Sequence, residues 1–130
     1  MDPIKSFMVP REKFITVERG TDVQTAARLM RDRRISSLFV TNGKEILGIL
    51  TDTDMVRRVA AAGVNTLTTT TEQIMSAPIL TIEGDKTVLD ASDMMAHTRI
   101  RHLGVTQDGK LVGMISVRDI LLFLTNLRKK

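Results

Sequence analysis

The sequence predicts an α+β protein, α/β-like in its alternation of elements, built from two tandem copies of one βαββα repeat. The first observation is an internal duplication: residues 14–60 align with residues 79–125 without a gap, and 12 of the 47 pairs are identical. Chance would give about three, so the chain is read first as a repeat protein. The second observation is that both copies show the same order of strand-like and helix-like apolar patterns. We expect the copies to pack sheet to sheet with pseudo-two-fold symmetry and with the helices outside.

The first copy begins with a short strand and continues into an amphipathic helix. The helix is expected from Asp22 onward, because Val23, Ala26, Ala27 and Met30 recur at helical spacing. Two further strands follow, and a second helix ends before a glycine. The strands are expected over residues 14–17, 37–41 and 45–50, and the second helix over residues 53–62.

The second copy repeats this order. Asn42-Gly43 in the first copy and Asp108-Gly109 in the second are strong signals for a tight turn between two antiparallel strands. The expected strands of the second copy cover residues 79–82, 102–106 and 110–115, and its helices cover residues 88–97 and 118–127.

The two copies are expected to share one core, because a single copy has too little apolar surface to close a core alone. Aromatic residues make up only 3% of the chain, so that core is expected to consist of aliphatic residues and methionine. The expected domains are residues 8–62 and 75–128, joined by a threonine-rich linker at 63–74.

The composition also limits the class of protein. The chain has no cysteine, which excludes a disulfide scaffold and a cysteine-based zinc site. No apolar run approaches the roughly 18 residues of a membrane span, and the first residues show no signal-peptide pattern. We therefore expect a cytoplasmic protein with no membrane partner. The net charge is +4, but no block of five like charges and no interleaved aromatics are present, which argues against nucleic acid.

One short motif closes the last strand of each copy. Residues 48–54 read GILTDTD and residues 113–119 read GMISVRD, so a glycine, two apolar residues, a hydroxyl and an aspartate recur in register. Thr51 with Asp54, and Ser116 with Asp119, resemble the capping box that begins a helix. The same helix N-terminus offers N–H groups to a phosphate, and a carboxylate beside it can accept hydrogen bonds from ribose hydroxyls. The residues alone leave both interpretations open.

The paired motifs resemble those of tandem cystathionine-β-synthase (CBS) domains. Each copy opens with a Met-x-x-Pro-like lead, at residues 75–78 and less well at 8–10, and the resemblance covers roughly residues 8 to 127. It implies that Thr51, Asp54, Ser116 and Asp119 hold the ribose and phosphate side of an adenine nucleotide. The adenine is then expected in the cleft between the copies.

A cationic group is expected to meet the phosphates in the second copy. Arg101 and His102 stand where basic residues of similar family members contact phosphate, and Arg118 lies inside the second motif. The alternative is that Arg101 and His102 are solvated residues at the start of a strand. His97 and His102 are too few ligands to predict a metal site.

The first copy departs from this pattern. Ser36 and Ser37 replace the two basic residues, and Phe39 and Gly104 stand where the family usually has proline. Phe39 is expected to fill part of the first cleft and Gly104 to open the second.

The resemblance favours a stand-alone regulatory module that binds AMP, ADP or ATP and signals to an unknown effector protein. No catalytic constellation is found, so an enzyme is not expected, and no obligatory cofactor is expected. The helices that follow the two motifs are apolar around much of their circumference, which predicts a homodimer. The alternative function is a ligand-free dimerisation or interaction module, in which the motifs only cap helices.

Overall fold

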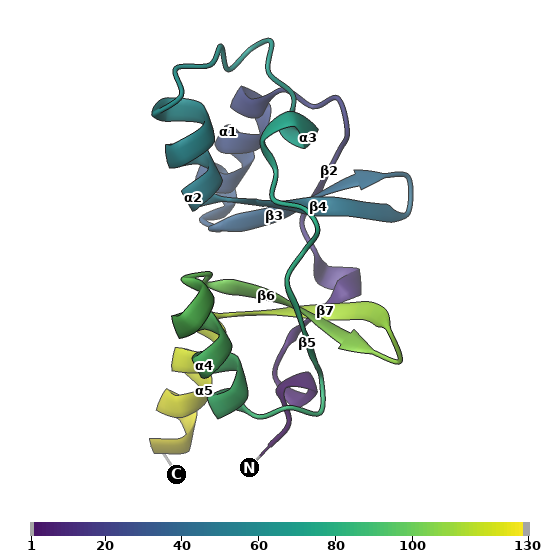
Figure 1. Ribbon diagram of the computed structural model, residues 1–130, viewed down its shortest axis with the longest axis vertical. Helices are drawn as coiled ribbons and strands as arrows, with labels where there is room; N and C mark the ends of the chain where they lie inside the picture. The colour runs from purple at the N-terminus through teal and green to yellow at the C-terminus, as the bar shows by residue number, and fades with distance from the viewer. Residues whose placement is uncertain (1, 129–130) are drawn as a thin grey trace. The chain divides into compact units, whose positions relative to one another are not determined.

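The computed structural model describes residues 2–128, which fold as two compact units (Figure 1). The repeat-1 unit consists of Ile15–Ile79. The repeat-2 unit combines the segment that ends at Phe14 with the segment that begins at Leu80. Both units contain a sheet with helices on one face, so the α+β class and the two βαββα repeats are confirmed. The sheet-to-sheet packing of the repeats stays a prediction.

The repeat-1 unit contains a three-stranded sheet of order β2-β3-β4. Strands β2 (Thr16–Glu18) and β3 (Ser37–Asn42) are parallel, whereas β3 and β4 (Glu45–Thr51) are antiparallel. The helices of this unit lie on one face of the sheet in Figure 1. They are α1 (Val23–Arg33), α2 (Asp52–Asp54), its π-helical continuation η3 (Met55–Ala60), and α3 (Thr71–Ile74).

The repeat-2 unit contains the equivalent sheet with one strand more, in the order β1-β7-β6-β5. Strand β1 (Val9–Pro10) comes from the N-terminal segment and pairs antiparallel with β7 (Lys110–Ser116). The other elements are β5 (Thr81–Glu83), β6 (His102–Gln107), α4 (Val88–Thr98) and α5 (Val117–Arg128). Two short 3-10 turns, η1 (Ile4–Ser6) and η2 (Arg11–Lys13), flank β1.

Each unit has its own apolar core between its sheet and its helices. In the repeat-1 unit, Leu38 and Val40 of β3 pack into the core with Ala26 and Met30 of α1. Because strand residues alternate between faces, Phe39 lies on the opposite face of β3, where it is 2% exposed. The described cores contain mainly aliphatic residues and methionine, as the composition predicts.

The segment that leads into each repeat pairs with the last strand of the other repeat. Val9 lies opposite Met114 of β7, and Ser76 exchanges two backbone hydrogen bonds with Ile49 of β4, with N–O distances of 2.8 and 3.0 Å. The leads approach so closely that a Cβ on Gly48 would lie 2.7 Å from the Sδ of Met75. The motif glycine therefore provides room for the lead. The domain boundaries at 8–62 and 75–128 stay a prediction, and the pairs above place each lead against the last strand of the other repeat.

Two predicted elements of repeat 1 differ in detail from the structure. The first hairpin turns at Gly43-Lys44, one residue later than predicted, because Asn42 still pairs with Glu45. Gly43 has a φ of +61°, which a glycine at the first turn position tolerates. The second helix of repeat 1 changes to π-helical geometry after Asp54 and ends at Ala60. The Asp108-Gly109 turn is confirmed.

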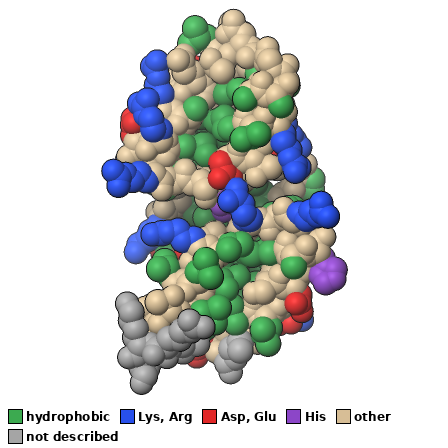
Figure 2. Space-filling model, turned by 90° about the vertical axis from the view of Figure 1, so that its left-hand side faces the viewer, with side chains coloured by type: hydrophobic (Ala, Val, Ile, Leu, Met, Phe, Trp, Pro, Cys, Tyr) green, Lys and Arg blue, Asp and Glu red, His purple; other side chains and the backbone are tan. Residues whose placement is uncertain are grey.

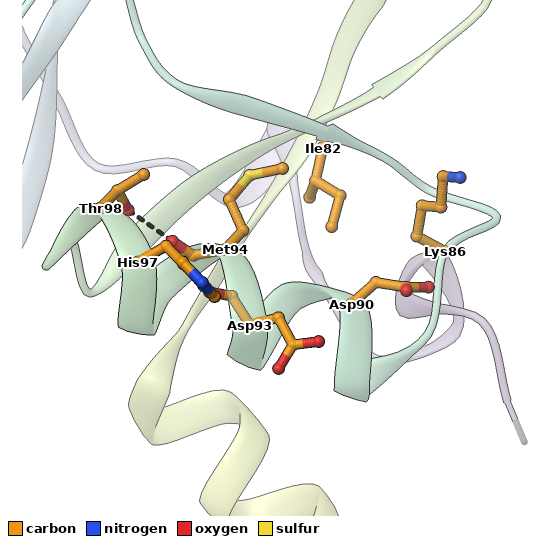
Figure 3. Close-up of a pocket in the computed structure, with 7 residues that line it drawn as sticks. All are labelled: Ile82, Lys86, Asp90, Asp93, Met94, His97 and Thr98. Carbon is orange, nitrogen blue, oxygen red and sulfur yellow. Dashed lines mark hydrogen bonds between the residues drawn. The ribbon is translucent and has the colours of Figure 1, made fainter.

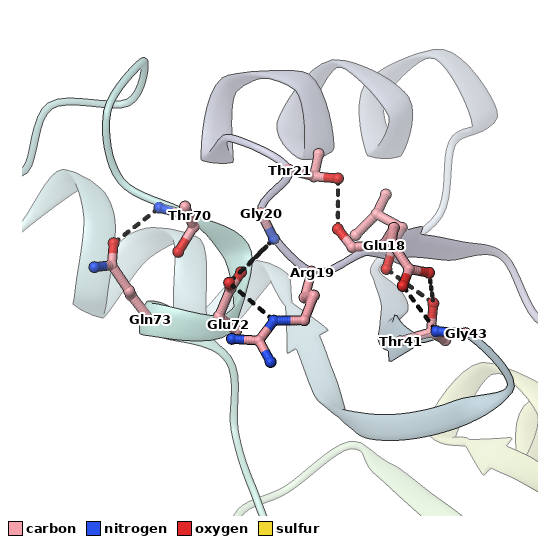
Figure 4. A network of polar contacts seen from close by, with 10 residues as sticks. Glu18, Arg19, Gly20, Thr21, Thr41, Gly43, Thr70, Glu72 and Gln73 are labelled. Atoms are coloured by element: carbon pink, nitrogen blue, oxygen red, sulfur yellow. Dashed lines mark hydrogen bonds and ion pairs between the residues drawn. The ribbon is translucent and has the colours of Figure 1, made fainter.

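A polar network joins the connecting segment, residues 63–74, to the start of the repeat-1 sheet (Figure 4). Both carboxylate oxygens of Glu72 in α3 accept from the backbone N–H of Gly20, at 2.8 and 3.0 Å, and Arg19 lies 3.8 Å away. On the other side of the network, Glu18 accepts from Gly43 and Thr41. These contacts fix α3, and with it the lead at Ser76, against the unit.

Candidate functional site

The first motif forms a complete capping box at the end of β4. The Oγ1 of Thr51 accepts from the backbone N–H of Asp54 at 3.3 Å, and Oδ2 of Asp54 accepts from the backbone N–H of Thr51 at 2.9 Å. The Thr51 hydroxyl also lies 3.2 Å from the same oxygen. The sequence folds this way because a hydroxyl and an acid three residues apart satisfy backbone donors that helix geometry leaves unpaired.

The second oxygen of the Asp54 carboxylate is engaged from outside the motif. Its Oδ1 accepts from the hydroxyl of Ser76 at 2.9 Å, and the Nε of Arg58 lies 3.8 Å away. Arg58 is itself anchored, because its Nη1 donates to the carbonyl of Met75 at 2.8 Å. Asp54 is 4% exposed. Both oxygens of this buried carboxylate thus have partners within the protein.

The second motif builds the same box at the end of β7. Oδ2 of Asp119 accepts from the backbone N–H and from the hydroxyl of Ser116, both at 2.9 Å, and the Ser116 hydroxyl accepts from the N–H of Asp119 at 3.2 Å. Asp119 is half-buried. Among the described residues, no hydrogen bond or ion pair engages its Oδ1, which leaves one acceptor available to a ligand.

The two motifs differ because their neighbours differ. Val9 occupies in the repeat-2 unit the register position that Ser76 occupies in the repeat-1 unit, and valine has no hydroxyl to donate. Phe123 stands at the repeat position of Arg58, and its ring stacks on Phe7 with centroids 4.2 Å apart. The lead and the helix therefore contact each other through an aromatic pair in one unit and through polar groups in the other.

The predicted phosphate contacts lie at the start of β6 and at the start of α5. His102 pairs with Ser116 across the β6-β7 ladder and is 6% exposed, so it is not the solvated residue of the alternative interpretation. Arg101 precedes it and is exposed, and its carbonyl accepts from the N–H of Val117 at 3.0 Å. Arg118 is exposed in the first turn of α5, next to Asp119.

The structure thus divides the seven predicted residues between the two units. Arg101, His102, Ser116, Arg118 and Asp119 lie in the repeat-2 unit, around the ends of β6 and β7. Thr51 and Asp54 lie in the repeat-1 unit. Sequence reasoning missed Ser76 and Arg58, which complete the first motif. The signal for Ser76 was available, since the lead Met-x-x-Pro contains it, but its pairing partner was not visible from the sequence repeat.

A hollow lies away from both motifs, over α4 in the repeat-2 unit (Figure 3). It has a volume of about 510 Å³, and none of the predicted site residues lines it. Two of its polar side chains bond the helix itself: Nδ1 of His97 lies 2.8 Å from the carbonyl of Asp93, and the Thr98 hydroxyl donates to the carbonyl of Met94. Asp90 caps the helix through Thr87.

Two classes of feature are absent from residues 2–128. No group of three or more His, Asp or Glu side chains there is placed to hold a metal ion. None of the helices within the same residues has the length and apolar character of a membrane span.

The helical faces of both units carry hydrophobic side chains at the surface (Figure 2). They are concentrated on α5, where Leu121 is 58% exposed and Leu122 and Leu124 are also exposed, while Ile120 is buried in the core. On η3, Val56 is exposed next to Arg57. The predicted apolar surplus on the helix after the second motif is therefore present in the structure.

Comparison with known proteins identifies the repeat. The CBS domain family model matches the chain twice, over residues 4–61 and 72–126. An uncharacterized protein of Methanopyrus kandleri is 36% identical over 87% of the chain, and CBS domain-containing proteins of Arabidopsis thaliana match over 84% of it. The matched regions span 59% of the Methanopyrus protein and 20% of the first Arabidopsis protein.

Solved structures share the fold over nearly the whole chain. An uncharacterized conserved protein from Pyrococcus horikoshii superposes with a TM-score of 0.85 at 31% identity, covering 95% of this chain and 92% of its own. A protein with CBS domains from Burkholderia ambifaria, assigned to signal transduction, has a TM-score of 0.80 at 32% identity, covering 88% and 84%. CBSX2, solved in complex with AMP, shares the fold at 20% identity with a TM-score of 0.77, covering 98% and 99%.

Proposed function

Because the chain belongs to the CBS domain family and carries two CBS domains in tandem, we propose that it is a regulatory module that binds an adenine nucleotide. Nucleotide binding would change the conformation of the module, and a partner protein would respond to that change according to the nucleotide concentration. The proposed ligands are AMP, ADP or ATP, and no obligatory cofactor or catalytic step is part of the proposal.

The observation that carries this proposal is the open carboxylate oxygen of Asp119. A ribose offers two adjacent hydroxyl donors, and a fixed carboxylate is a strong acceptor for them. The capping box holds Asp119 through two bonds to Oδ2, so its orientation is set before a ligand arrives. Preorganisation of this kind reduces the entropy lost on binding.

Charge supports a phosphorylated ligand over a free nucleoside. Arg101 and Arg118 are exposed at the strand end and helix start that flank Asp119, and an arginine guanidinium matches phosphate geometry. The N-terminus of the 12-residue helix α5 adds a favourable dipole. AMP is the first ligand to test, because CBSX2, which has the same fold, was crystallised with it.

Calorimetric titration of the protein with AMP and with adenosine tests the proposal. We expect AMP to bind more tightly than adenosine, and added salt to weaken AMP binding as the ionic contacts are screened. In Arg101→Ala/Arg118→Ala the preference for AMP should disappear, while adenosine binding is retained. A protein that binds no adenine nucleotide at millimolar concentration would contradict the proposed function.

A second candidate function is a ligand-free interaction module. The exposed leucines of α5 favour it, since an apolar helix face at the surface is typical of an interaction site. We propose a homodimer through this face in either case. The titration above distinguishes the candidates, because only the first requires a nucleotide.

A further inference from the structure

We infer that Ser76 and Arg58 occupy the Asp54 carboxylate of the first motif and give it a structural role, so that each chain binds one nucleotide, through the second motif alone. We call this arrangement of Asp54, Ser76 and Arg58 the latch. This inference rests on the proposed function for its ligand. The sequence repeat presents the two motifs as equivalent, and the structure shows that their carboxylates are not.

The first step is the number of acceptors that remain. Each carboxylate oxygen of Asp54 already accepts a hydrogen bond, from the Thr51 N–H at 2.9 Å and from the Ser76 hydroxyl at 2.9 Å. To bind Asp54, a ribose would have to displace the Ser76 hydroxyl and reach a side chain that is only 4% exposed. Breaking an existing bond to a buried charge offsets most of what a new bond to ribose would contribute.

The second step is that the latch belongs to the fold of the repeat-1 unit. Ser76 is held by its two backbone bonds to Ile49, and Arg58 bonds the carbonyls of Ile74 and Met75. The donor to Asp54 is therefore fixed by a backbone pair and is not a mobile side chain at the surface. The latch ties the lead, the strand end and the helix after the motif into one structure.

The third step is the comparison with the other unit, which lacks both donors. Val9 and Phe123 replace them, and Oδ1 of Asp119 has no partner among the described residues. The cationic residues Arg101 and Arg118 lie on this side as well, whereas Ser36 and Thr53 stand at their repeat positions. The open acceptor of Asp119 and the two exposed arginines thus favour the second motif for an anionic ligand, whereas Arg58 beside the first motif is held by Asp54 and the backbone of the lead.

Calorimetry with AMP tests the stoichiometry. We expect one AMP per chain in the unmodified protein, and an affinity lowered about tenfold or more in Asp119→Asn, with no second site of original affinity remaining. Ser76→Ala should bind AMP at the second motif with unchanged affinity. Two AMP per chain, or one AMP per chain still bound tightly by Asp119→Asn, would overturn the inference and leave the proposed function standing.

A matched pair of variants transfers the latch to the second motif. Val9→Ser places a hydroxyl at the position equivalent to Ser76, whereas Val9→Ala removes the same packing and adds no donor. We expect Val9→Ser to bind AMP about three- to tenfold more weakly than Val9→Ala, because the new hydroxyl competes for the oxygen of Asp119. Equal affinities of the two variants would contradict the latch mechanism.

Thermal unfolding tests the latch without any ligand. Ser76→Ala and Asp54→Ala should each lower Tm by several degrees, and the double variant should lower it by clearly less than the sum, because both remove the same contact. Ser6→Ala, an exposed serine bonded only to its own turn, serves as the control. Tm losses that add up in the double variant would contradict the contact between Ser76 and Asp54. If AMP does not bind at all, the proposed function is wrong. The Tm measurements on the single and double variants then still test the structural role of Asp54 and Ser76.

Discussion

Thr71 places a hydroxyl in the interior of the repeat-1 unit. Its side chain is 0% exposed, and its Oγ1 has no hydrogen-bond partner in the described part of the chain. Its backbone N–H is satisfied by the carbonyl of Thr21 at 2.9 Å. A buried hydroxyl without a partner costs free energy that a methyl group of the same shape would not.

Thr71→Val should therefore raise the free energy of unfolding by about 1 kcal/mol, since valine keeps the shape and removes the unpaired oxygen. Chemical denaturation measures the change. Thr16→Val, at an exposed position of β2 in the same unit, is the control and should shift stability by less than about 0.5 kcal/mol. A loss of stability in Thr71→Val would show that the hydroxyl has a partner that matters.

Gly48 has a role that its place in a motif does not reveal. A Cβ at this position would lie 2.7 Å from the Sδ of Met75 and 2.7 Å from the carbonyl oxygen of Ser76. We expect Gly48→Ala to lower the free energy of unfolding by about 1–3 kcal/mol, because the backbone of the lead must move away. Denaturant unfolding of Gly48→Ala, Met75→Ala and the double variant tests whether the clash with the lead is the cause. The stability lost through Gly48→Ala should be smaller in the Met75→Ala background but not zero, because the carbonyl oxygen of Ser76 remains close.

At the scale of elements, three carboxylates lie at or near the starts of helices, and folding lowers the pKa of each. The side chain and the N–H of Thr25 lower the pKa of Asp22 at the start of α1, and the backbone N–H of Thr87 lowers that of Asp90 at the start of α4. Burial raises the pKa of Glu72, but the N–H of Gly20 and further hydrogen bonds outweigh it, so the net shift is downward. The charged forms stabilise the native state.

These shifts predict the direction of acid denaturation. Because the pKa values are lower in the folded state, the unfolded chain binds protons first as pH falls. Stability from these groups should be fully present above the ordinary carboxyl values, near pH 4, and lost progressively below them. Thermal unfolding from pH 6 to pH 2.5 measures this. In Asp22→Asn/Asp90→Asn the dependence on pH should be smaller, and an unchanged profile would contradict the assignment.

Helices and strands were predictable wherever the repeat aligned them. Val40 pairs with Gly48, and Val105 pairs with Gly113, as the identical residues of the two copies require. The 3-10 turns and strand β1 were not predicted, because segments of two or three residues carry no periodicity to detect. The latch was not predicted either, since Ser76 lies outside the aligned residues.

At the scale of the whole molecule, the exposed face of α5 predicts association. Leu121, Leu122 and Leu124 leave apolar area in water that a second copy could cover. Light scattering at micromolar concentration should show a dimer of the unmodified chain, and Leu121→Glu/Leu124→Glu should be monomeric. Leu67→Glu, at an exposed leucine of the connecting segment, should remain dimeric. A monomeric unmodified chain would contradict the proposed dimer.

The exchange of leads sets an order for the growing chain during synthesis. The repeat-1 unit is continuous, so all of its residues are available once Ile79 has left the ribosome. The repeat-2 unit is not: Arg11 donates to the carbonyl of Leu111, 100 residues further along the chain. Loops of this length cost entropy to close and slow the pairing that closes them. Strand β1 is thus made before the repeat-1 unit but pairs after it, because β1 must wait for β7 while the repeat-1 unit is already able to fold.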